Sequence, residues 1–262
     1  MERAYSVKNI TPQQAKALLA NNVSNRPMNN SLADSYAKEM SAGRWSFNGD
    51  SIRISDDGVI LDGQHRLQAI VLSGIAQRYV IVDGLPSESF HTIDRGKKRT
   101  TADSLAILGE KNVGALAAAL RVIAMLEDKS VTWNGGPIST GKQMDVLSAH
   151  PGVRHWCSIF STSGLRSKFD SSICSCATLF AEKYGNDKIE MFMTQLSHGE
   201  SLAKTDPAYV LRERAIANRT SFSKIPKIAM LAIQIKGFKA FVDGRSVTRL
   251  TFQPGKEQFP YI

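Results

Sequence analysis

The sequence predicts an α+β protein in which a small mixed-sheet domain is followed by an all-helical domain. Three observations lead to this prediction. Short apolar segments with strand-like alternation lie mainly before residue 99, helical periodicity dominates from Thr101 onward, and a dense basic segment separates the two regions. Strands and helices in separate runs are typical of an α+β fold or of separate domains. We therefore expect a domain over residues 1–99 and a helical domain over residues 100–262.

Strands and helices alternate in the first region. Thr11-Pro12-Gln13-Gln14 combines an N-cap, a first-turn proline and a capping-box glutamine, which predicts a helix through about Ala20. A second helix is expected from a Ser31 cap to a stop at Gly43. The other expected elements are strands at Ser51–Ser55, Val59–Leu61 and Arg78–Val82, a turn at Asp56–Gly58, and a helix from Leu67 that ends at Gly74.

The second region has helical patterns almost throughout. The predicted helices are Ala102–Leu108, Val113–Leu126, Gly141–Ala149, Ile173–Tyr184, Lys188–Leu196, Pro207–Asn218 and Ile225–Val242, and one strand, Val247–Phe252, is expected after them.

Composition narrows the class of protein. No apolar run approaches the roughly 20 residues that span a bilayer, and the N-terminus lacks an apolar signal core, so we expect a cytoplasmic protein with no membrane partner. Three cysteines suit a reducing compartment better than a disulfide framework. The net charge of +9 favours a polyanion such as nucleic acid, and the alternative is a solvated surface that is merely basic.

The segment Asp62-Gly63-Gln64-His65-Arg66 lies between a predicted strand and a predicted helix. A glycine there lets the backbone approach a ligand closely, and the first turn of a helix favours an anion. His65 and Arg66 add side-chain donors at the same place, and Arg is a natural bidentate partner of phosphate oxygens. The sequence therefore predicts a phosphate-binding turn, and the alternative is an ordinary strand-to-helix turn with Arg66 in a surface ion pair.

The same segment, extended to Leu61–Ala69, resembles the signature box of the ParB/sulfiredoxin superfamily, in the form found in phage and prophage ParB-like (DGQHR) proteins. The resemblance covers about Asn25 to Leu108. Its flanking segments, in the expected order, are Asn25-Arg26-Pro27, Met40–Trp45 and Ser51–Ser55 before the box, and Asp83-Gly84-Leu85 and Phe90–Thr100 after it.

The resemblance implies a small mixed sheet that binds the phosphates of ATP, ADP or CTP, in a bacterial or phage-infected cell. By position, Gly63, His65 and Arg66 match the phosphate binders of the family, and Gln64 is expected to join them. Gln64 stands where sulfiredoxins have their catalytic cysteine, which excludes sulfinic-acid repair. The box also differs from the Glu-Arg-Arg form of the partition proteins, and no clear copy of their second nucleotide motif is present. Magnesium is expected because nucleotide phosphates usually bring it.

Two further basic groups are candidate contacts with phosphate. The segment Asp94–Thr100 is the densest positive cluster, and it predicts a second phosphate or DNA contact or, equally, a solvated linker. Its cations are Arg95, Lys97, Lys98 and Arg99. The last predicted helix and the tail supply candidate DNA contacts, with a solvated face as the alternative. These are Lys224, Lys227, Lys236, Lys239, Arg245 and Arg249.

Candidates for catalysis and metal binding are few. Asp62 could hold a metal ion or orient His65, and the alternative is a turn-stabilising side chain. Gly136–Lys142 has the spacing of a phosphate-binding loop, but Gln143 replaces its Ser or Thr, so a capped helix start is favoured. The three cysteines, Cys157, Cys174 and Cys176, are expected as buried apolar residues and no metal site is predicted.

The resemblance, together with the positive net charge, implies a ParB-like, phage-type nucleotide-binding protein that binds or processes DNA. The alternatives are a nucleotide-consuming kinase, transferase or nucleotidase acting on a small substrate, a ParB-like nuclease, and an interaction protein whose turn is vestigial. Whether the chain is an NTP hydrolase, a phosphotransferase or a nuclease stays open, as does a homodimer.

Overall fold

The computed structural model describes residues 4–22, 27–93, 99–131, 138–199 and 202–262. The chain divides into two compact units, Met1–Lys98 and Arg99–Ile262, which we call the N-terminal unit and the helical unit. The division falls one residue before the one that the sequence predicts. The described residues form one four-stranded sheet and eleven α-helices, a mixed α/β composition.

The sheet belongs to the N-terminal unit and has the strand order β1-β4-β2-β3. β1 (Ala4–Ile10) and β4 (Gln77–Leu85) are antiparallel, β4 and β2 (Ser51–Ser55) are parallel, and β2 and β3 (Ile60–Asp62) form an antiparallel hairpin. The mixed sheet is therefore confirmed, as are the three predicted strands.

Strand β1 is not among the predicted elements. It is an edge strand that pairs with β4 alone, and both Tyr5 and Val7 are exposed. Apolar and polar residues alternate only over residues 5–8, and Asn9 interrupts the pattern before the buried Ile10, so the strand-like signal is short.

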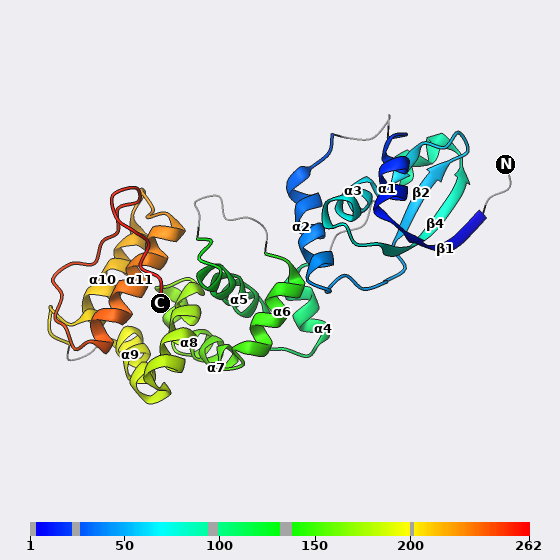
Figure 1. Cartoon of the computed structure of the whole chain (residues 1–262). Coiled ribbons are helices and arrows are strands. Elements are labelled where there is room, and N and C mark those ends of the chain that lie inside the picture. The colour runs from blue at the N-terminus through cyan, green and yellow to red at the C-terminus, as the bar shows by residue number, and fades with distance from the viewer. Residues whose placement is uncertain (1–3, 23–26, 94–98, 132–137, 200–201) are drawn as a thin grey trace. The chain divides into compact units, whose positions relative to one another are not determined.

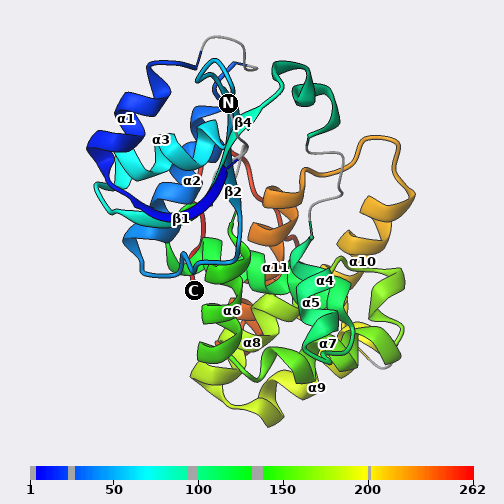
Figure 2. The same ribbon diagram turned by 90° about the vertical axis from the view of Figure 1, so that its right-hand side faces the viewer.

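Three helices lie on one side of this sheet (Figure 1, Figure 2): α1 (Pro12–Leu19), α2 (Asn30–Ser41) and α3 (Gln64–Ser73). The capping box of α1 is confirmed, since Thr11 and Gln14 bond to each other's backbone N–H. The predicted cap of α2 is wrong. Asn29, not Ser31, is the N-cap, and its Oδ1 accepts from the Leu32 N–H at 3.1 Å. Asn satisfies this role as well as Ser does.

The core of the N-terminal unit lies between these helices and the sheet. Ile52 and Tyr79 from the sheet pack with Leu67 and Ile70 of α3, and all four are at most 1% exposed. Helix α3 ends at Gly74, which has a positive φ, as the sequence predicts. The buried face of α3 thus holds the helix, and the turn before it, in one position.

The helical unit contains α4 (Thr101–Ile107), α5 (Val113–Glu127), α6 (Thr140–Ala149), α7 (Val153–Thr162), α8 (Ser172–Tyr184), α9 (Asn186–His198), α10 (Pro207–Thr220) and α11 (Lys227–Val242). The seven predicted helices are confirmed, and α7 is an addition. The predicted strand Val247–Phe252 is wrong, because residues 245–253 form no strand and Leu250 simply packs into the core.

Helix α11 is buried on nearly all sides. Phe238 packs edge-to-face on Phe192 of α9, with ring centroids 4.7 Å apart, and also contacts Phe180 of α8. Gly237 lets α10 approach closely, since a Cβ there would lie 2.8 Å from the Leu211 Cδ2. Pro226 precedes the helix, so α11 begins at Lys227 rather than at the predicted Ile225.

Within the described ranges, none of the helices combines the length and the apolar character needed to cross a membrane.

Candidate functional site

The turn between β3 and α3 depends on a glycine. Gly63 is the N-cap of α3, with a φ of 104° and no side chain to cap the helix. A Cβ at this position would lie 2.4 Å from the Ile52 Cδ1 and 3.4 Å from the Ile52 Cα. Both the left-handed backbone and the close approach to β2 therefore require glycine. Gly63 therefore places the first helical turn of α3 directly after the end of β3.

Arg66 lies in this first turn and is held by two acceptors. Its Nη2 donates to the Ser51 carbonyl at 2.7 Å and to the Asp62 Oδ2 at 2.9 Å. Its side chain is 18% exposed. The Nε is buried and has no acceptor among the described residues. The guanidinium is thus fixed in place with one donor still unused.

Asp62 is shared by two guanidiniums. Its Oδ2 lies 3.8 Å from the Arg53 Nη1 as well as 2.9 Å from Arg66. Arg53 faces Asp62 across the β2–β3 hairpin, where the two residues are register partners. Two positive groups around one carboxylate leave this cluster, Arg53–Asp62–Arg66, with a net charge of +1. The expectation that Asp62 stabilises the turn agrees with these contacts.

Arg53 was not a candidate in the sequence. The predicted hairpin around Asp56–Gly58 carried the relevant signal, because pairing the two strands brings Arg53 opposite Asp62. The pairing of Arg53 with Asp62 could not be predicted, because it depends on a β-bulge between Arg53 and Ile54. In a regular hairpin without the bulge, Arg53 would not face Asp62.

His65 and Gln64 are buried and join α3 to the chain between α1 and α2. The Asn29 N–H donates to the His65 Nε2 at 3.1 Å, and the Asn22 Nδ2 donates to the Gln64 Oε1 at 2.9 Å. The His65 Nε2 is thus an acceptor in this contact, and His65 and Arg66 have different partners. Arg53 and Arg66 are the two guanidiniums near the turn.

Tyr79 lies in the same neighbourhood. Burial raises the pKa of Tyr79 above its ordinary value, against a smaller opposing effect of the Arg66 guanidinium. The phenol is 1% exposed and stays protonated at any ordinary pH. It adds a neutral polar group beside Arg66.

The segment that would supply the second phosphate contact falls largely outside the described residues. Arg95, Lys97 and Lys98 belong to that segment. Arg99 is described, is exposed, and is the first residue of the helical unit. Phosphate binding by these four cations stays a prediction.

The cations near α11 fall into different environments. The Lys236 Nζ donates to the Thr251 carbonyl at 2.8 Å and pairs with Glu257, and the Lys239 Nζ donates to the Tyr261 carbonyl at 2.7 Å. Burial lowers the pKa of Lys239 below its ordinary value, helped by Lys183. Both lysines therefore hold the C-terminal tail against the helix.

The other four cations are exposed: Lys224 and Lys227 at the start of α11, and Arg245 and Arg249 after its end. Since 16 residues of helix span about 24 Å, the two pairs do not form a single basic face. DNA contact by these four stays a prediction.

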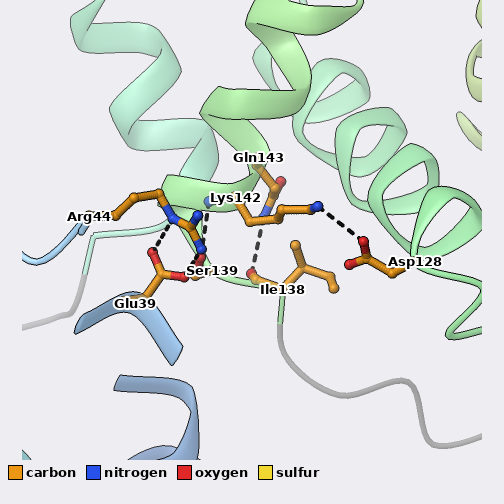
Figure 3. A network of polar contacts seen from close by, with 7 residues as sticks. All are labelled: Glu39, Arg44, Asp128, Ile138, Ser139, Lys142 and Gln143. Atoms are coloured by element: carbon orange, nitrogen blue, oxygen red, sulfur yellow. Dashed lines mark hydrogen bonds and ion pairs between the residues drawn. The ribbon is translucent and has the colours of Figure 1, made fainter. Parts of the chain in front are cut away.

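The stretch with phosphate-loop spacing contains a capped helix start. Ser139 is the N-cap of α6 and accepts from the Lys142 N–H at 3.0 Å. The Lys142 Nζ donates to the Asp128 Oδ1 at 3.1 Å, and the Gln143 Nε2 donates to the Ile138 carbonyl at 3.2 Å (Figure 3). Lys142 and Gln143 therefore make contacts within the helical unit. This agrees with the capped helix start that the sequence favours over a phosphate-binding loop.

Glu39 is also engaged locally. Its two carboxylate oxygens accept from the Nε and Nη2 of Arg44 at 3.0 and 2.7 Å (Figure 3). This bidentate pair closes the end of α2 and identifies no acid or base for catalysis.

No group of three or more His, Cys, Asp or Glu side chains in the described parts of the chain could hold a metal ion. Cys157, Cys174 and Cys176 are free thiols in the core of the helical unit, each at most 1% exposed. A hydrogen bond with Cys157 and burial raise the pKa of Cys174, and burial raises that of Cys176. They are packed as small apolar residues, as predicted.

In comparisons with known proteins, no family model, curated protein or solved structure matches the chain.

Proposed function

We propose that this chain is a ParB/sulfiredoxin-like nucleotide-binding protein that binds or processes DNA, with the nucleotide phosphates at the turn Gly63–Arg66. The observation on which the proposal depends is the Gly63 turn with Arg66 fixed in the first turn of α3. The left-handed glycine, packed against Ile52, fixes the direction in which α3 starts, and the start of a helix favours negative charge.

The charges around the turn support an anion. Arg53 and Arg66 exceed Asp62 by one positive charge, and the unused Nε of Arg66 is a donor in a buried setting. A buried donor without an acceptor costs about 1–3 kcal/mol, so a phosphate oxygen that accepts from it would recover that cost. Arg66 is already immobilised by Ser51 and Asp62, which reduces the entropy lost on binding.

Asp62 opposes the same anion. A phosphate that bonds to Arg66 must share the guanidinium with this carboxylate, so Asp62 is expected to lower the affinity of the site. Because Asp62 is occupied by two guanidiniums, it is also poorly placed as a metal ligand. Magnesium is therefore expected to be bound by the nucleotide phosphates.

The DNA part of the proposal depends on charge. The chain has a net charge of +9, and Lys224, Lys227, Arg245 and Arg249 are exposed cations. Each cation placed against a phosphate releases condensed counterions, which favours binding at low salt.

A thermal-shift titration tests the nucleotide site. The full chain is titrated with ATP, ADP, CTP and GTP in the presence of magnesium, as wild type, as Arg66→Gln and as Arg78→Gln. Arg78 is exposed on β4 and lies over the Phe47 ring, so it is a matched control for the loss of one arginine. A nucleotide at 100 times its Kd raises stability by about 2.7 kcal/mol.

We expect at least one nucleotide to raise the Tm of wild type and Arg78→Gln but not that of Arg66→Gln. If no nucleotide shifts the wild type, the nucleotide proposal is abandoned. The rival roles are separated by two assays on the same protein. Phosphate release without DNA supports a nucleotide-consuming enzyme, and plasmid nicking without added nucleotide supports a nuclease.

A further inference from the structure

A polar pocket lies in the helical unit, between the end of α10 and the start of α11. These two helices run side by side (Figure 1). The segment Lys168–Asp170, after the short 3-10 helix η2 (Leu165–Ser167), completes its wall. The volume is about 340 Å³, at the lower end of the range for small-molecule pockets. We call it the α10–α11 pocket.

The polar group in the interior of this pocket is Gln234, which is fully buried on α11. Its Oε1 lies 2.8 Å from the Ser172 Oγ and 3.9 Å from the Cys176 Sγ. Its Nε2 has no hydrogen-bond partner in the described part of the chain. Buried amide groups are nearly always paired, so the free end of this side chain points to a ligand group.

The Ser172 hydroxyl has one proton and two neighbours, the Gln234 Oε1 and the Asp170 Oδ1. If that proton goes to Gln234, the amide presents its N–H₂ to the pocket. If it goes to Asp170, the amide turns and presents its carbonyl oxygen. The amide-like edge of a nucleobase has N–H and C=O groups side by side and can pair with either end.

The rim of the pocket is strongly basic. Its cations are Lys168, Arg219, Lys224 and Lys227, against the single carboxylate of Asp170, which leaves a net charge of +3. Asp170 is itself occupied, because its Oδ1 accepts from the Ser172 N–H at 3.1 Å and from the Ser172 hydroxyl. The rim therefore favours a ligand with about two negative charges, such as a phosphate monoester.

The contacts of Arg219 hold its positive charge at the pocket. Its guanidinium donates to the carbonyls of Arg166 at 3.2 Å, Lys168 at 3.3 Å and Phe169 at 2.6 Å. Backbone carbonyls fix the side chain without neutralising it. Lys224 is also held by backbone carbonyls, because its Nζ donates to those of Asn218 and Arg219.

Apart from Asn218, the remaining lining is apolar. Phe169 and Met230 are nearly fully buried and Ile225 is partly buried, and all three line the pocket. An apolar wall between a cationic rim and a buried amide matches a molecule with a charged end, a flat body and a polar edge.

We propose that the α10–α11 pocket binds a mononucleotide, with its phosphate among Lys168, Arg219, Lys224 and Lys227 and its base toward Gln234. The 5′-phosphorylated end of a single strand offers the same chemistry as a free nucleotide. The pocket is separate from the Gly63–Arg66 turn, and its proposal does not depend on that site.

The test is calorimetric titration of the full chain carrying Arg66→Gln, which removes the contribution of the first site. The probes are UMP, GMP, AMP and CMP, with inorganic phosphate and uridine as comparators, and a 5′-phosphorylated oligonucleotide. We expect one-site binding of at least one mononucleotide, with inorganic phosphate and uridine each weaker by at least about tenfold.

Two variants address the two ends of the ligand. Gln234→Met keeps the volume and removes the amide, and Lys224→Gln/Lys227→Gln removes two exposed charges. Each is expected to weaken mononucleotide binding by about tenfold or more. Lys204→Gln, an exposed lysine of the same unit outside the pocket, is expected to leave it unchanged. If Gln234→Met fails to fold, the exposed lysine variant still tests the site.

The oligonucleotide identifies the source of the ligand. Tighter binding of its phosphorylated end than of any mononucleotide, lost in the lysine variant, assigns the pocket to strand ends, and the reverse order assigns it to free nucleotides. The proposal is overturned if no mononucleotide binds, if inorganic phosphate binds equally well, or if both pocket variants retain full affinity.

Discussion

Gly63 and Ile52 are so close that a methyl group on Gly63 would lie 2.4 Å from the Ile52 Cδ1. The contact joins the start of α3 to the middle of β2, and it sets the position of Arg66 relative to the Ser51 carbonyl. Two predictions follow from this relationship and from the charges around it, and two more concern the helical unit.

Gly63→Ala is expected to destabilise the protein by about 1–3 kcal/mol, since it combines a positive φ with a steric overlap. Ile52→Val removes the Cδ1 that causes the overlap, at a cost of about 0.5–1.5 kcal/mol on its own. The double variant should be more stable than the sum of the two single effects. Urea denaturation of the four proteins measures the coupling. Simple additivity would show that the overlap relaxes without cost.

Asp62→Asn is expected to raise nucleotide affinity by about three- to tenfold, because Arg53 and Arg66 lose the carboxylate that competes with phosphate. The direction of this effect is informative, since removing a metal ligand or a catalytic base would lower binding or activity instead. Calorimetry of wild type and Asp62→Asn checks it. Asp56→Asn, an exposed position in the turn between β2 and β3, is the control and should change nothing.

The stability of the helical unit is expected to fall as pH rises above neutrality, because of His150. Burial alone would lower the pKa of His150, but hydrogen bonds with Glu127 and Glu182 outweigh it and raise the pKa above its ordinary 6.5. A group with a raised folded pKa contributes fully below its unfolded pKa, and the contribution is lost as pH rises through the folded value. His150 is also the C-cap of α6, where the helix dipole favours a cation.

The measurement is the Tm of wild type and His150→Gln between pH 6 and pH 9. We expect the wild type to exceed the variant at pH 6 by about 2–4 °C, the response to about 1 kcal/mol in a protein of this size, and the difference to shrink toward pH 9. His155→Gln, which removes a half-exposed pair with Glu190, serves as the comparison. A constant difference across this range would rule out the coupling to protonation.

The cations near α11 should separate into two classes in a DNA-binding assay. Arg245→Gln/Arg249→Gln should reduce the slope of log affinity against log salt by up to about 2, at about 0.9 per phosphate contact. Lys236→Gln/Lys239→Gln should leave the slope unchanged and lower the Tm, because these lysines bind the Thr251 and Tyr261 carbonyls. Equal slopes for wild type and the arginine variant would show that Arg245 and Arg249 do not contact DNA phosphates.

Local signals accounted for most of the secondary structure. The capping box at Thr11 predicted the start of α1, and Gly74 predicted the end of α3, because each acts within one turn of helix. Strand β1 had only a short signal, the alternation over residues 5–8, because an exposed edge strand buries little apolar surface. Val247–Phe252 had a strand-like signal, but its apolar residues pack onto the helical core, and the described residues of the helical unit offer no strand to pair with.

The candidate site was predictable only in part. The need for glycine at position 63 and a buried apolar face on α3 follow from the order of residue types along the chain. The sharing of Asp62 between Arg53 and Arg66 does not, because it results from a bulged hairpin register. The α10–α11 pocket was equally hidden, since its cations come from segments about 50 residues apart in the chain.

The sequence by itself determined the elements, the glycine turn and the excess of positive charge, because these depend on neighbours within a few residues. Only the tertiary structure decided what the polar side chains do: His65 accepts a backbone N–H from Asn29, Lys236 holds the tail, and the buried Nε2 of Gln234 has no partner among the described residues. The physical reason is that a hydrogen bond needs a partner within about 3 Å, and the partner's position is set by packing between distant segments.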